Sequence, residues 1–427
     1  MLSSRSSHTD VIALLDIGSS KVACAIAQLK RDKNGANGIH ILGFGQRRAN
    51  GVRAGMIVDL DRAEAGVRGA ISDAEADAGL TVKELTVALS SGRLHSNHFN
   101  ARLELEAGHV RSNDLQRLAL RARQYAERDG RALVYLNRIH YALDGETGIR
   151  APKGMHGKRL TCQFHAVTGE MTLLNNLECL IERCYLKVRN FVPTGFASSI
   201  AATTPDEQRI GVTCIDIGAG AAKITVIVDG RFIYTDTVVT GGAILTHDIA
   251  RIFSISLAEA ERLKTLYGAL INLRHDRPGG VPYWDANVDR LVTYRALQGE
   301  IQETTVAELS HILYNRTRRQ LEFIKERLDK SSLTRELAQS VVLTGGGSQL
   351  TGLSNLATEV LGRPVRIGAA NNCAGLAPEY QGPALSTVVG LGLIHKAPAE
   401  LVHASGVRKR TDETYMSRME QWLRESF

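Results

Sequence analysis

The sequence predicts an α/β protein with more than one domain, and three glycine-containing turns along the chain lead to that prediction. Residues 11–29 and 211–230 repeat one pattern, in which an apolar strand, a short turn and a second strand-like run follow one another. Residues 340–362 combine an apolar strand, three glycines and a helical pattern. At 427 residues the chain is longer than one hydrophobic core usually supports, so we expect about two to four domains or subdomains.

The first segment, VIALLDIGSSKVACAIAQL, carries an aspartate near the end of its first strand. The residues after its turn continue as a β-rich run, which excludes a Rossmann fingerprint and a P-loop because each of these opens a helix. Gly18 permits close approach of a ligand, and successive backbone N–H groups of such a turn suit phosphate oxygens. Asp16 faces the same point and is suited to hold magnesium, directly or through water.

The second segment, GVTCIDIGAGAAKITVIVDG, repeats this arrangement with Asp216, Gly218 and Gly220. Taken singly, each turn is more readily explained as an ordinary β-hairpin. The repetition favours phosphate binding, since two such turns facing each other would clamp a triphosphate.

The third segment, SVVLTGGGSQLTGLSNLATEVLG, places three glycines between a strand and a helix. The strand is expected to end at Thr344, and the helix to begin near Ser348 or Leu350 and to end at Gly362. A helix N-terminus behind a glycine loop suits an anion or a flat base lying against the backbone.

The composition is that of a folded, reduced protein. Hydrophobic residues make up 44% of the chain and charged residues 23%, and the net charge of +7 weakly favours anionic partners. The six cysteines form no CxxC pair, which indicates free thiols. No run approaches the roughly 20 apolar residues that span a bilayer, and the apolar run before Asp16 is too short for a signal peptide. Any membrane contact is therefore expected to be peripheral.

The order of these motifs resembles the actin, Hsp70 and sugar kinase superfamily. Within it, the sequence resembles the FtsA family of bacterial cell division proteins over essentially its whole length. The resemblance implies an α/β actin-like ATPase fold, in which two lobes of four subdomains (1A, 1C, 2A and 2B) close on ATP and Mg²⁺ and a C-terminal amphipathic helix follows. The segments that carry it are DIGSSKVACAIA, GGAILTHDIARIF followed by LAEAERLKTLYG, TGGGSQLTGL and EQWLRESF.

The resemblance also implies the limits of the subdomains, with 1C inserted into 1A. In chain order the expected segments are 1A (8–92), 1C (93–164), 1A (165–207), 2A (208–250), 2B (251–330), 2A (331–377), a return to 1A (378–396), a linker (397–410) and the amphipathic helix (411–427).

Carried over position by position, the resemblance implies a nucleotide site made of both turns, the glycine loop and a helix of lobe two. Asp16 and Asp216 are the implied magnesium ligands. Alternatives remain open, because Lys21 is also explained as a solvated strand residue and Glu261 with Lys264 as an i,i+3 surface pair. The implied ATP-binding residues are Asp16, Gly18, Ser19, Ser20, Lys21, Asp216, Gly218, Ala219, Gly220, Glu261, Lys264, Gly345, Gly346 and Gly347.

Two departures from the family pattern bear on hydrolysis. DIGAGAAK stands where the family usually has DIGGGTxD, so Ala221 supplies no hydroxyl and Lys223 reverses a charge beside the phosphates. Thr194 stands where many relatives have Glu or Gln to orient water, and a Thr is a poor general base. We therefore expect ATP binding with slow or absent hydrolysis and assign no catalytic residue.

The insert is rich in arginine around DLQRLALRARQYAERDG. A solvated helix face explains this charge, and a basic docking surface for a division partner is the alternative. Nucleic acid is not expected, because no interleaved aromatic residues accompany the charge. The two histidines of HSNH, residues 95–98, lack further ligands nearby, so no zinc site is expected. The arginines are Arg111, Arg117, Arg121, Arg123, Arg128, Arg131 and Arg138.

Subdomain 2B ends in a basic helical stretch, ELSHILYNRTRRQLEFIKERLDK. The resemblance implies that it receives the acidic C-terminal tail of the tubulin-like division protein FtsZ. A solvated helix explains the same charges about as well. The implied contact residues are Arg316, Arg318, Arg319 and Lys325.

The last 17 residues read as an amphipathic helix too short to span a bilayer, so we expect it to lie in the membrane interface. One such helix would bind weakly, and a row of them on a polymer would bind far more tightly. The alternative is a helix docked on the protein's own core. The expected membrane residues are Tyr415, Met416, Met419, Trp422, Leu423 and Phe427.

Together these features predict an ATP-binding adaptor that polymerises. The resemblance implies that it ties the FtsZ ring to the anionic, cytoplasmic face of the inner membrane at the division site and recruits later division membrane proteins. The alternatives are an actin-like assembly ATPase of a pilus or cell-shape system, and an actin-fold kinase of a small molecule.

Overall fold

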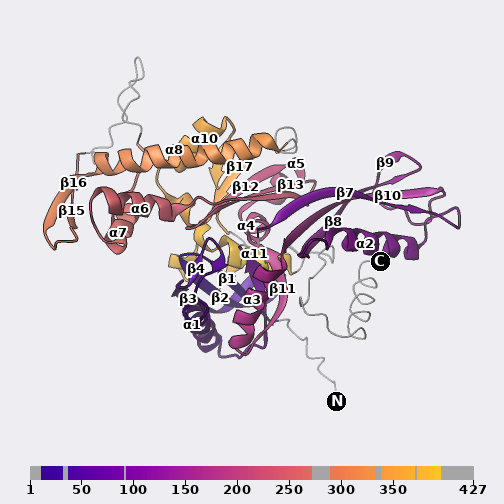
Figure 1. Ribbon diagram of the computed structural model, residues 1–427, viewed down its shortest axis with the longest axis horizontal. Helices are drawn as coiled ribbons and strands as arrows, with labels where there is room; N and C mark the ends of the chain where they lie inside the picture. Colours follow the sequence, from indigo (N-terminus) through magenta and orange to yellow (C-terminus); the bar gives the residue numbers. More distant parts are fainter. Residues whose placement is uncertain are drawn as a thin grey trace.

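Three large β-sheets, two two-stranded hairpins and the helices between them form the fold of the computed structural model (Figure 1). The structure describes residues 11–31, 37–90, 93–271, 289–331, 338–370 and 373–395. Two of the sheets form the bases of two lobes, and the third belongs to an insert that projects to one side of them (Figure 1).

The first lobe is built on a six-stranded sheet of order β11-β6-β1-β2-β3-β19. Its centre is an antiparallel hairpin of β1 and β2, and β6 and β11 continue the sheet in parallel from β1. A short hairpin of β4 and β5 follows β3. The bounds are β1 (Val11–Ile17), β2 (Lys21–Arg31), β3 (Asn37–Arg48), β4 (Val52–Arg53), β5 (Met56–Ile57), β6 (Glu84–Leu89), β11 (Lys187–Pro193) and β19 (Cys373–Ala374).

The second lobe repeats this topology in a five-stranded sheet of order β18-β17-β12-β13-β14. Again an antiparallel hairpin lies at the centre, and two parallel strands extend the sheet from its first strand. The repeated sequence pattern therefore corresponds to a repeated topology. The bounds are β12 (Val212–Ile217), β13 (Ala222–Val228), β14 (Arg231–Val238), β17 (Ser340–Thr344) and β18 (Val365–Ile367).

Two helices of similar length, α4 (Thr194–Ala202) and α11 (Ser386–Ile394), pack against each other between the two sheets. They are apolar nearly all round, as expected of helices buried on every side. Gly390 of α11 lies against the backbone of Ala197 in α4, an approach that leaves no room for a side chain. The outer face of the first sheet is covered by α1 (Leu60–Ala78) and α3 (Met171–Arg183).

Helices of the second lobe carry the arm at the left of Figure 1. The longest, α8, begins where the Thr305 hydroxyl accepts a hydrogen bond from the Glu308 N–H (3.1 Å), and Leu309, Leu313 and Leu321 bury one side of it. A two-stranded hairpin forms the end of the arm. The bounds are α5 (Pro205–Ile210), α6 (Gly242–Ile252), α7 (Leu257–Tyr267), β15 (Leu291–Arg295), β16 (Ile301–Thr305), α8 (Val306–Lys330) and α10 (Leu353–Leu361).

The insert is a four-stranded sheet of order β7-β10-β8-β9 with one helix, α2, packed on it. It projects away from the arm of lobe two (Figure 1). Because β10 pairs with β8 as far as Glu170, the boundary expected at residue 164 falls inside this strand. The HSNH sequence lies in β7. The bounds are β7 (His95–Glu104), α2 (Ser112–Ala126), β8 (Arg131–Leu143), β9 (Glu146–Ile149) and β10 (Arg159–Glu170).

The helix after the glycine loop starts later than the sequence predicted. A short 3₁₀ turn, η1 (Gly346–Gln349), follows the glycines, and α10 begins only at Leu353. Gly352 separates the two with a φ of 84°, a left-handed conformation that a glycine adopts without strain. The predicted end at Gly362 is confirmed, again by a left-handed glycine.

Candidate functional site

The two turns predicted from the sequence have matching geometry. The N–H of Gly18 donates to the carbonyl of Lys21 (2.9 Å), and the N–H of Gly218 donates to the carbonyl of Ala221 (3.0 Å). A side chain on Gly18 would lie only 2.9 Å from that same carbonyl, so the first turn requires its glycine.

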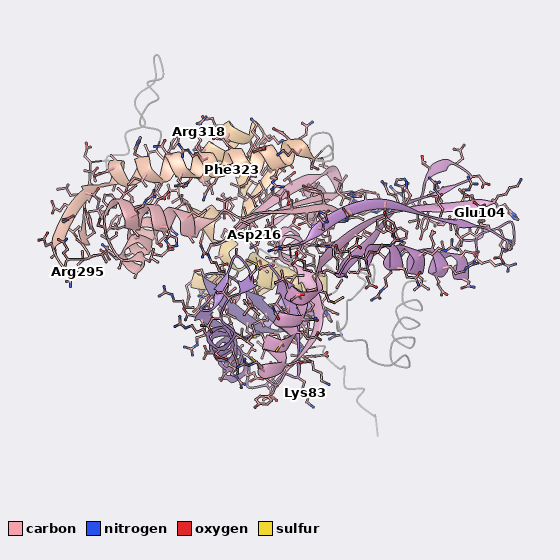
Figure 2. The ribbon with its side chains drawn as sticks, in the orientation of Figure 1. Lys83, Glu104, Asp216, Arg295, Arg318 and Phe323 are labelled. Atoms are coloured by element: carbon pink, nitrogen blue, oxygen red, sulfur yellow. The ribbon has the colours of Figure 1, made fainter. Side chains whose placement is uncertain are left out.

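These turns, from different lobes, meet face to face. A Cβ atom built on Gly220 would lie 2.6 Å from Oγ of Ser19 and 3.1 Å from the backbone of Ala54. The structure therefore brings Ser19 of the first turn and Gly220 of the second together. Figure 2 shows Asp216, beside the second turn, at the centre of the molecule where the lobes meet.

Four charged side chains from both hairpins surround this point, and we call Asp16, Lys21, Asp216 and Lys223 the inter-lobe charge cluster. Asp16 lies one residue before the end of β1, and Asp216 lies one residue before the end of β12. Burial raises the pKa of Asp16 to about 6, and the nearby ammonium of Lys223 offsets part of that rise. Burial lowers the pKa of Lys21, and both carboxylates oppose that effect. The cluster combines two carboxylates with two ammonium groups.

One carboxylate oxygen of this cluster has no hydrogen-bond partner in the described part of the chain. Oδ1 of Asp16 is buried without a hydrogen bond from any described residue, whereas Oδ2 of Asp216 accepts a long hydrogen bond from Thr387 (3.5 Å). A buried oxygen of this kind costs free energy unless a ligand satisfies it. This oxygen fits a magnesium ion or a water held by one.

Magnesium commonly takes one or two protein carboxylates and completes its octahedron with phosphate oxygens and water. The part of the chain that the structure describes contains no group of three or more histidine, cysteine or carboxylate side chains able to hold a metal. Asp16 and Asp216 are thus residues that would hold such an ion, together with the ligand. The ion would supply positive charge beside the phosphates.

The glycine loop after β17 closes one side of this site. Gly345 has a φ of 83°, and its Cα lies against Oδ1 of Asp216, so a side chain there would overlap the carboxylate. Gly347 packs in the same way on Ile217. Gly346 has open space around it, with only the Ala384 side chain near an added Cβ (3.9 Å). The loop requires glycine for its own packing and leaves one glycine free to face a ligand.

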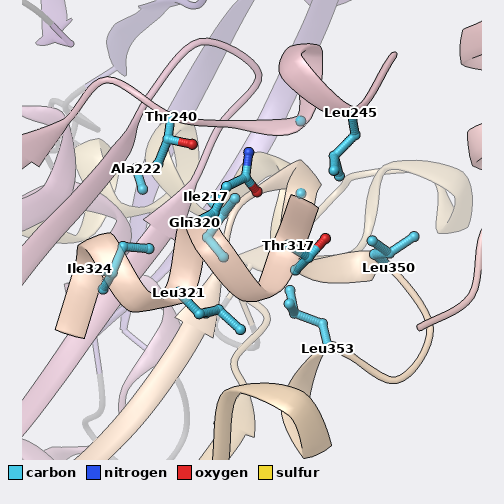
Figure 3. A pocket seen from close by; sticks show the side chains of 12 residues that line it. Ile217, Ala222, Thr240, Leu245, Thr317, Gln320, Leu321, Ile324, Leu350 and Leu353 are labelled. Atoms are coloured by element: carbon cyan, nitrogen blue, oxygen red, sulfur yellow. The ribbon is translucent and has the colours of Figure 1, made fainter. Parts of the chain in front are cut away.

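A small cavity lies behind the second turn, between α8 and the glycine loop (Figure 3). Its volume of about 20 Å³ has room for roughly one water. Most of its lining is apolar, but the Thr317 and Gln320 side chains also line it, and Oγ1 of Thr317 has no hydrogen-bond partner among the described residues. Gln320 donates to the Gly241 carbonyl (3.1 Å), which ties α8 to the segment before α6.

Glu261 and Lys264 of α7 are joined to the start of α6 beside the second turn. Their ion pair (2.7 Å) is the i,i+3 pair that the sequence left open, but Lys264 is also bonded to Thr246 (2.8 Å) and to the Gly242 carbonyl (3.2 Å). The Gly242 N–H in turn donates to the Gly218 carbonyl (3.0 Å). Through Gly242, the pair is therefore connected to the second turn.

Thr194, which stands where many relatives have Glu or Gln, is buried at the start of α4 and shares a hydrogen bond with the Ser90 hydroxyl (2.9 Å). That hydrogen bond holds the Thr194 hydroxyl against Ser90. The sequence did not single out the β4–β5 hairpin, although Ala54 within it lies against Gly220. The sequence signal that could have indicated this hairpin is the pair of glycines Gly51 and Gly55, whose left-handed φ values are 73° and 76°.

The four basic residues expected on α8 differ in their surroundings. Arg316 forms an ion pair with Asp248, and Arg318 forms one with Glu359 (2.7 Å). Arg319 and Lys325 are exposed and form no ion pair within the described part of the chain. Figure 2 shows Arg318 and the exposed Phe323 on the same helix.

Arginines of the insert make mostly local contacts. Arg117 pairs with Asp114 and Glu106, Arg123 pairs with Glu127, and Arg121 donates to the Arg102 carbonyl. These local contacts favour the interpretation of the arginines as a solvated helix face over a docking surface. The residues expected to bind the membrane, 411–427, lie outside the described residues. In the described ranges, no helix is long and apolar enough to cross a bilayer.

Known proteins resemble this chain in sequence and in structure. A family model described as "Cell division protein FtsA" matches residues 213–390, and one described as "SHS2 domain inserted in FTSA" matches residues 91–168. Cell division protein FtsA of Agrobacterium fabrum is 37% identical over 449 residues, which cover 100% of this chain and 96% of that protein.

Solved structures show the fold at lower identity. A PilM-PilN type IV pilus biogenesis complex matches with a TM-score of 0.61 and 16% identity over 90% of this chain and 98% of that one. MreB5 of Spiroplasma citri bound to ADP matches with a TM-score of 0.52 and 12% identity over 91% and 97%.

Two lobes of matching topology, joined by paired helices and facing each other through aspartate-bearing turns, define the class of actin-like proteins. Sequence identity over the whole chain then shows to which family of this class the protein belongs. The chain belongs to the FtsA family of bacterial cell division proteins, which sets aside the pilus, cell-shape and kinase alternatives.

Proposed function

We propose that the protein binds ATP with Mg²⁺ between its lobes and acts in division as an assembling membrane adaptor. The observation that carries the nucleotide part is the contact between the two turns, which sets Ser19 opposite Gly220 beside the inter-lobe charge cluster. Backbone N–H groups of both turns would hold the phosphates, and Lys21 would add charge.

The glycine loop would lie against the base, and Glu261 with Lys264 would approach the ribose. Hydrolysis would be slow or absent, since Thr194 is a poor general base and the Lys223 ammonium lies beside the second turn. The function would then come from assembly and docking rather than from turnover.

The adaptor part assigns one surface to each partner. Subdomain 2B would receive the acidic FtsZ tail on α8, and the insert would face later division proteins. Residues 411–427 would lie in the cytoplasmic face of the inner membrane at the division site, and self-assembly would multiply their weak individual binding.

Flotation on liposomes of anionic lipids, with ATP, tests this proposal. We expect the full chain to float, and a chain truncated after Arg410 and a Trp422→Glu variant to remain below. If all three float alike, or none floats, the anchoring role of residues 411–427 is wrong. Fluorescent ATP binding, measured on the same samples, reports the nucleotide part independently.

A further inference from the structure

Lys223 occupies an unusual position in the second hairpin. It is the residue directly opposite Asp216 in the β12–β13 register, so both side chains lie on one face of the sheet. Its ammonium reaches the turn, since a Cβ atom built on Gly218 would lie 3.2 Å from Nζ. Lys223 therefore points along the strand to the place where the two lobes meet.

The first hairpin has no counterpart to this lysine. There the residue opposite Asp16 is Ala23, and Lys21 instead closes the turn itself. The two lysines thus come from different positions of the repeated pattern and approach the same two carboxylates. Among charged neighbours, Lys223 opposes the burial-induced rise of the Asp16 pKa most strongly.

Neither lysine is used by an ion pair within 4 Å in the described part of the chain. Lys223 is half-buried, and burying an ammonium without close acceptors is costly unless a ligand supplies them. With both lysines and both aspartates charged, the cluster is neutral before any cation enters. A polyanion such as a triphosphate would meet no net repulsion there.

We propose that the Lys223 ammonium contacts the polyphosphate of the bound nucleotide and supplies charge that a divalent cation otherwise provides, so that this protein holds ATP with or without magnesium. The inference rests on the proposed nucleotide site and deepens it. Lysine binds phosphate as a point charge, and charge-assisted hydrogen bonds are among the stronger ones that proteins make.

Equilibrium binding of a fluorescent ATP analogue to the full chain, in excess Mg²⁺ and in EDTA, tests this inference. For the native sequence we expect the two Kd values to agree within about tenfold. Lys223→Met retains most of the side-chain volume and removes the charge, and it should weaken binding in EDTA by about tenfold to a hundredfold, with a smaller loss in Mg²⁺. Lys223→Arg should retain binding in EDTA, which separates charge from packing.

Lys83→Met is the matched control, because Lys83 is exposed at the far end of lobe one (Figure 2) and should leave both Kd values unchanged. If the native protein binds only with Mg²⁺, or if Lys223→Met binds like it in EDTA, the inference is wrong while the nucleotide site stands. If the native protein binds in neither condition, the proposed function fails and this inference fails with it.

Discussion

Gly220 of the second lobe faces Ser19 of the first so closely that an added Cβ would lie 2.6 Å from the serine Oγ and 3.1 Å from the backbone of Ala54. The contact joins the lobes and lies outside the core of each. Substitutions here should therefore affect the closed arrangement of the lobes more than the folding of either lobe.

Gly220→Val should weaken nucleotide binding about tenfold. Overpacking costs about 1–3 kcal/mol. Here it would destabilise the arrangement in which the two turns face each other. Titration with a fluorescent ATP analogue measures the loss, and the melting temperature without nucleotide should change little. Gly66→Ala is the control, because its added Cβ would make an ordinary 3.5 Å contact with the Arg48 carbonyl. A Gly220→Val protein with unchanged affinity would contradict the assignment of this turn.

On α8, Arg319→Glu combined with Lys325→Glu should lower affinity for a labelled FtsZ tail peptide about tenfold. These two side chains are exposed without ion-pair partners among the described residues, and each such charge contributes up to about 1 kcal/mol. Fluorescence anisotropy at low and high salt measures the loss, which salt should diminish. Lys83→Glu combined with Lys187→Glu, at two exposed positions of the other lobe, controls for the change in net charge. Equal binding by the double variant would place the peptide elsewhere.

Gly390→Ala should destabilise the protein strongly. Its Cβ would overlap the Ala197 carbonyl where α11 crosses α4, and neither backbone has room to retreat between the sheets. We expect a loss of about 3 kcal/mol or more, which exceeds the gain of about 1 kcal/mol that alanine brings to a helix. Urea unfolding measures it, with Gly66→Ala on α1 as a helical glycine that should instead gain stability. A stable Gly390→Ala protein would mean that the helices are less closely packed.

The sequence was sufficient to predict features that depend on neighbouring residues. The apolar runs that contain Asp16 and Asp216, the glycine turns after them and the β-rich runs that follow predicted both hairpins, and the actin-like fold is confirmed by the comparisons. The structure brings the predicted nucleotide residues together, and their role as ligands stays a prediction. The start of α10 was misplaced because a left-handed Gly352 breaks the helix after η1, and turn glycines look alike in sequence.

Features that depend on distant residues were beyond the sequence. The pairing of Arg318 with Glu359 joins two helices, so nothing near either residue signals it. The contact of the insert with lobe two also joins residues that are far apart in the sequence. His165 of β10 reads as an ordinary strand residue, yet its Nδ1 lies 2.8 Å from the Phe232 carbonyl of β14.

That histidine should make the protein sensitive to mild acid. His165 is fully buried, and burial lowers its pKa to about 3, below the value of about 6.5 in an unfolded chain. The unfolded state therefore binds the proton more readily, and the free energy of unfolding should fall as pH drops below about 6.5. One proton gives a loss of about 1.4 kcal/mol by pH 5.5.

Urea unfolding from pH 7.5 to 5.5 measures this slope. The neighbouring ring of His98 stacks on that of His165, with 4.9 Å between the ring centroids. Burial lowers the pKa of His98 as well, so His98 adds to the dependence of the unfolding free energy on pH. His165→Asn should lower stability at pH 7.5, because it disturbs the hydrogen bonds with Ser96 and Phe232, and should also flatten the dependence on pH. Hydrogen exchange should show β14 losing protection first in the native protein, since this cluster joins the insert to lobe two. A slope that His165→Asn leaves unchanged would assign the acid sensitivity to other groups.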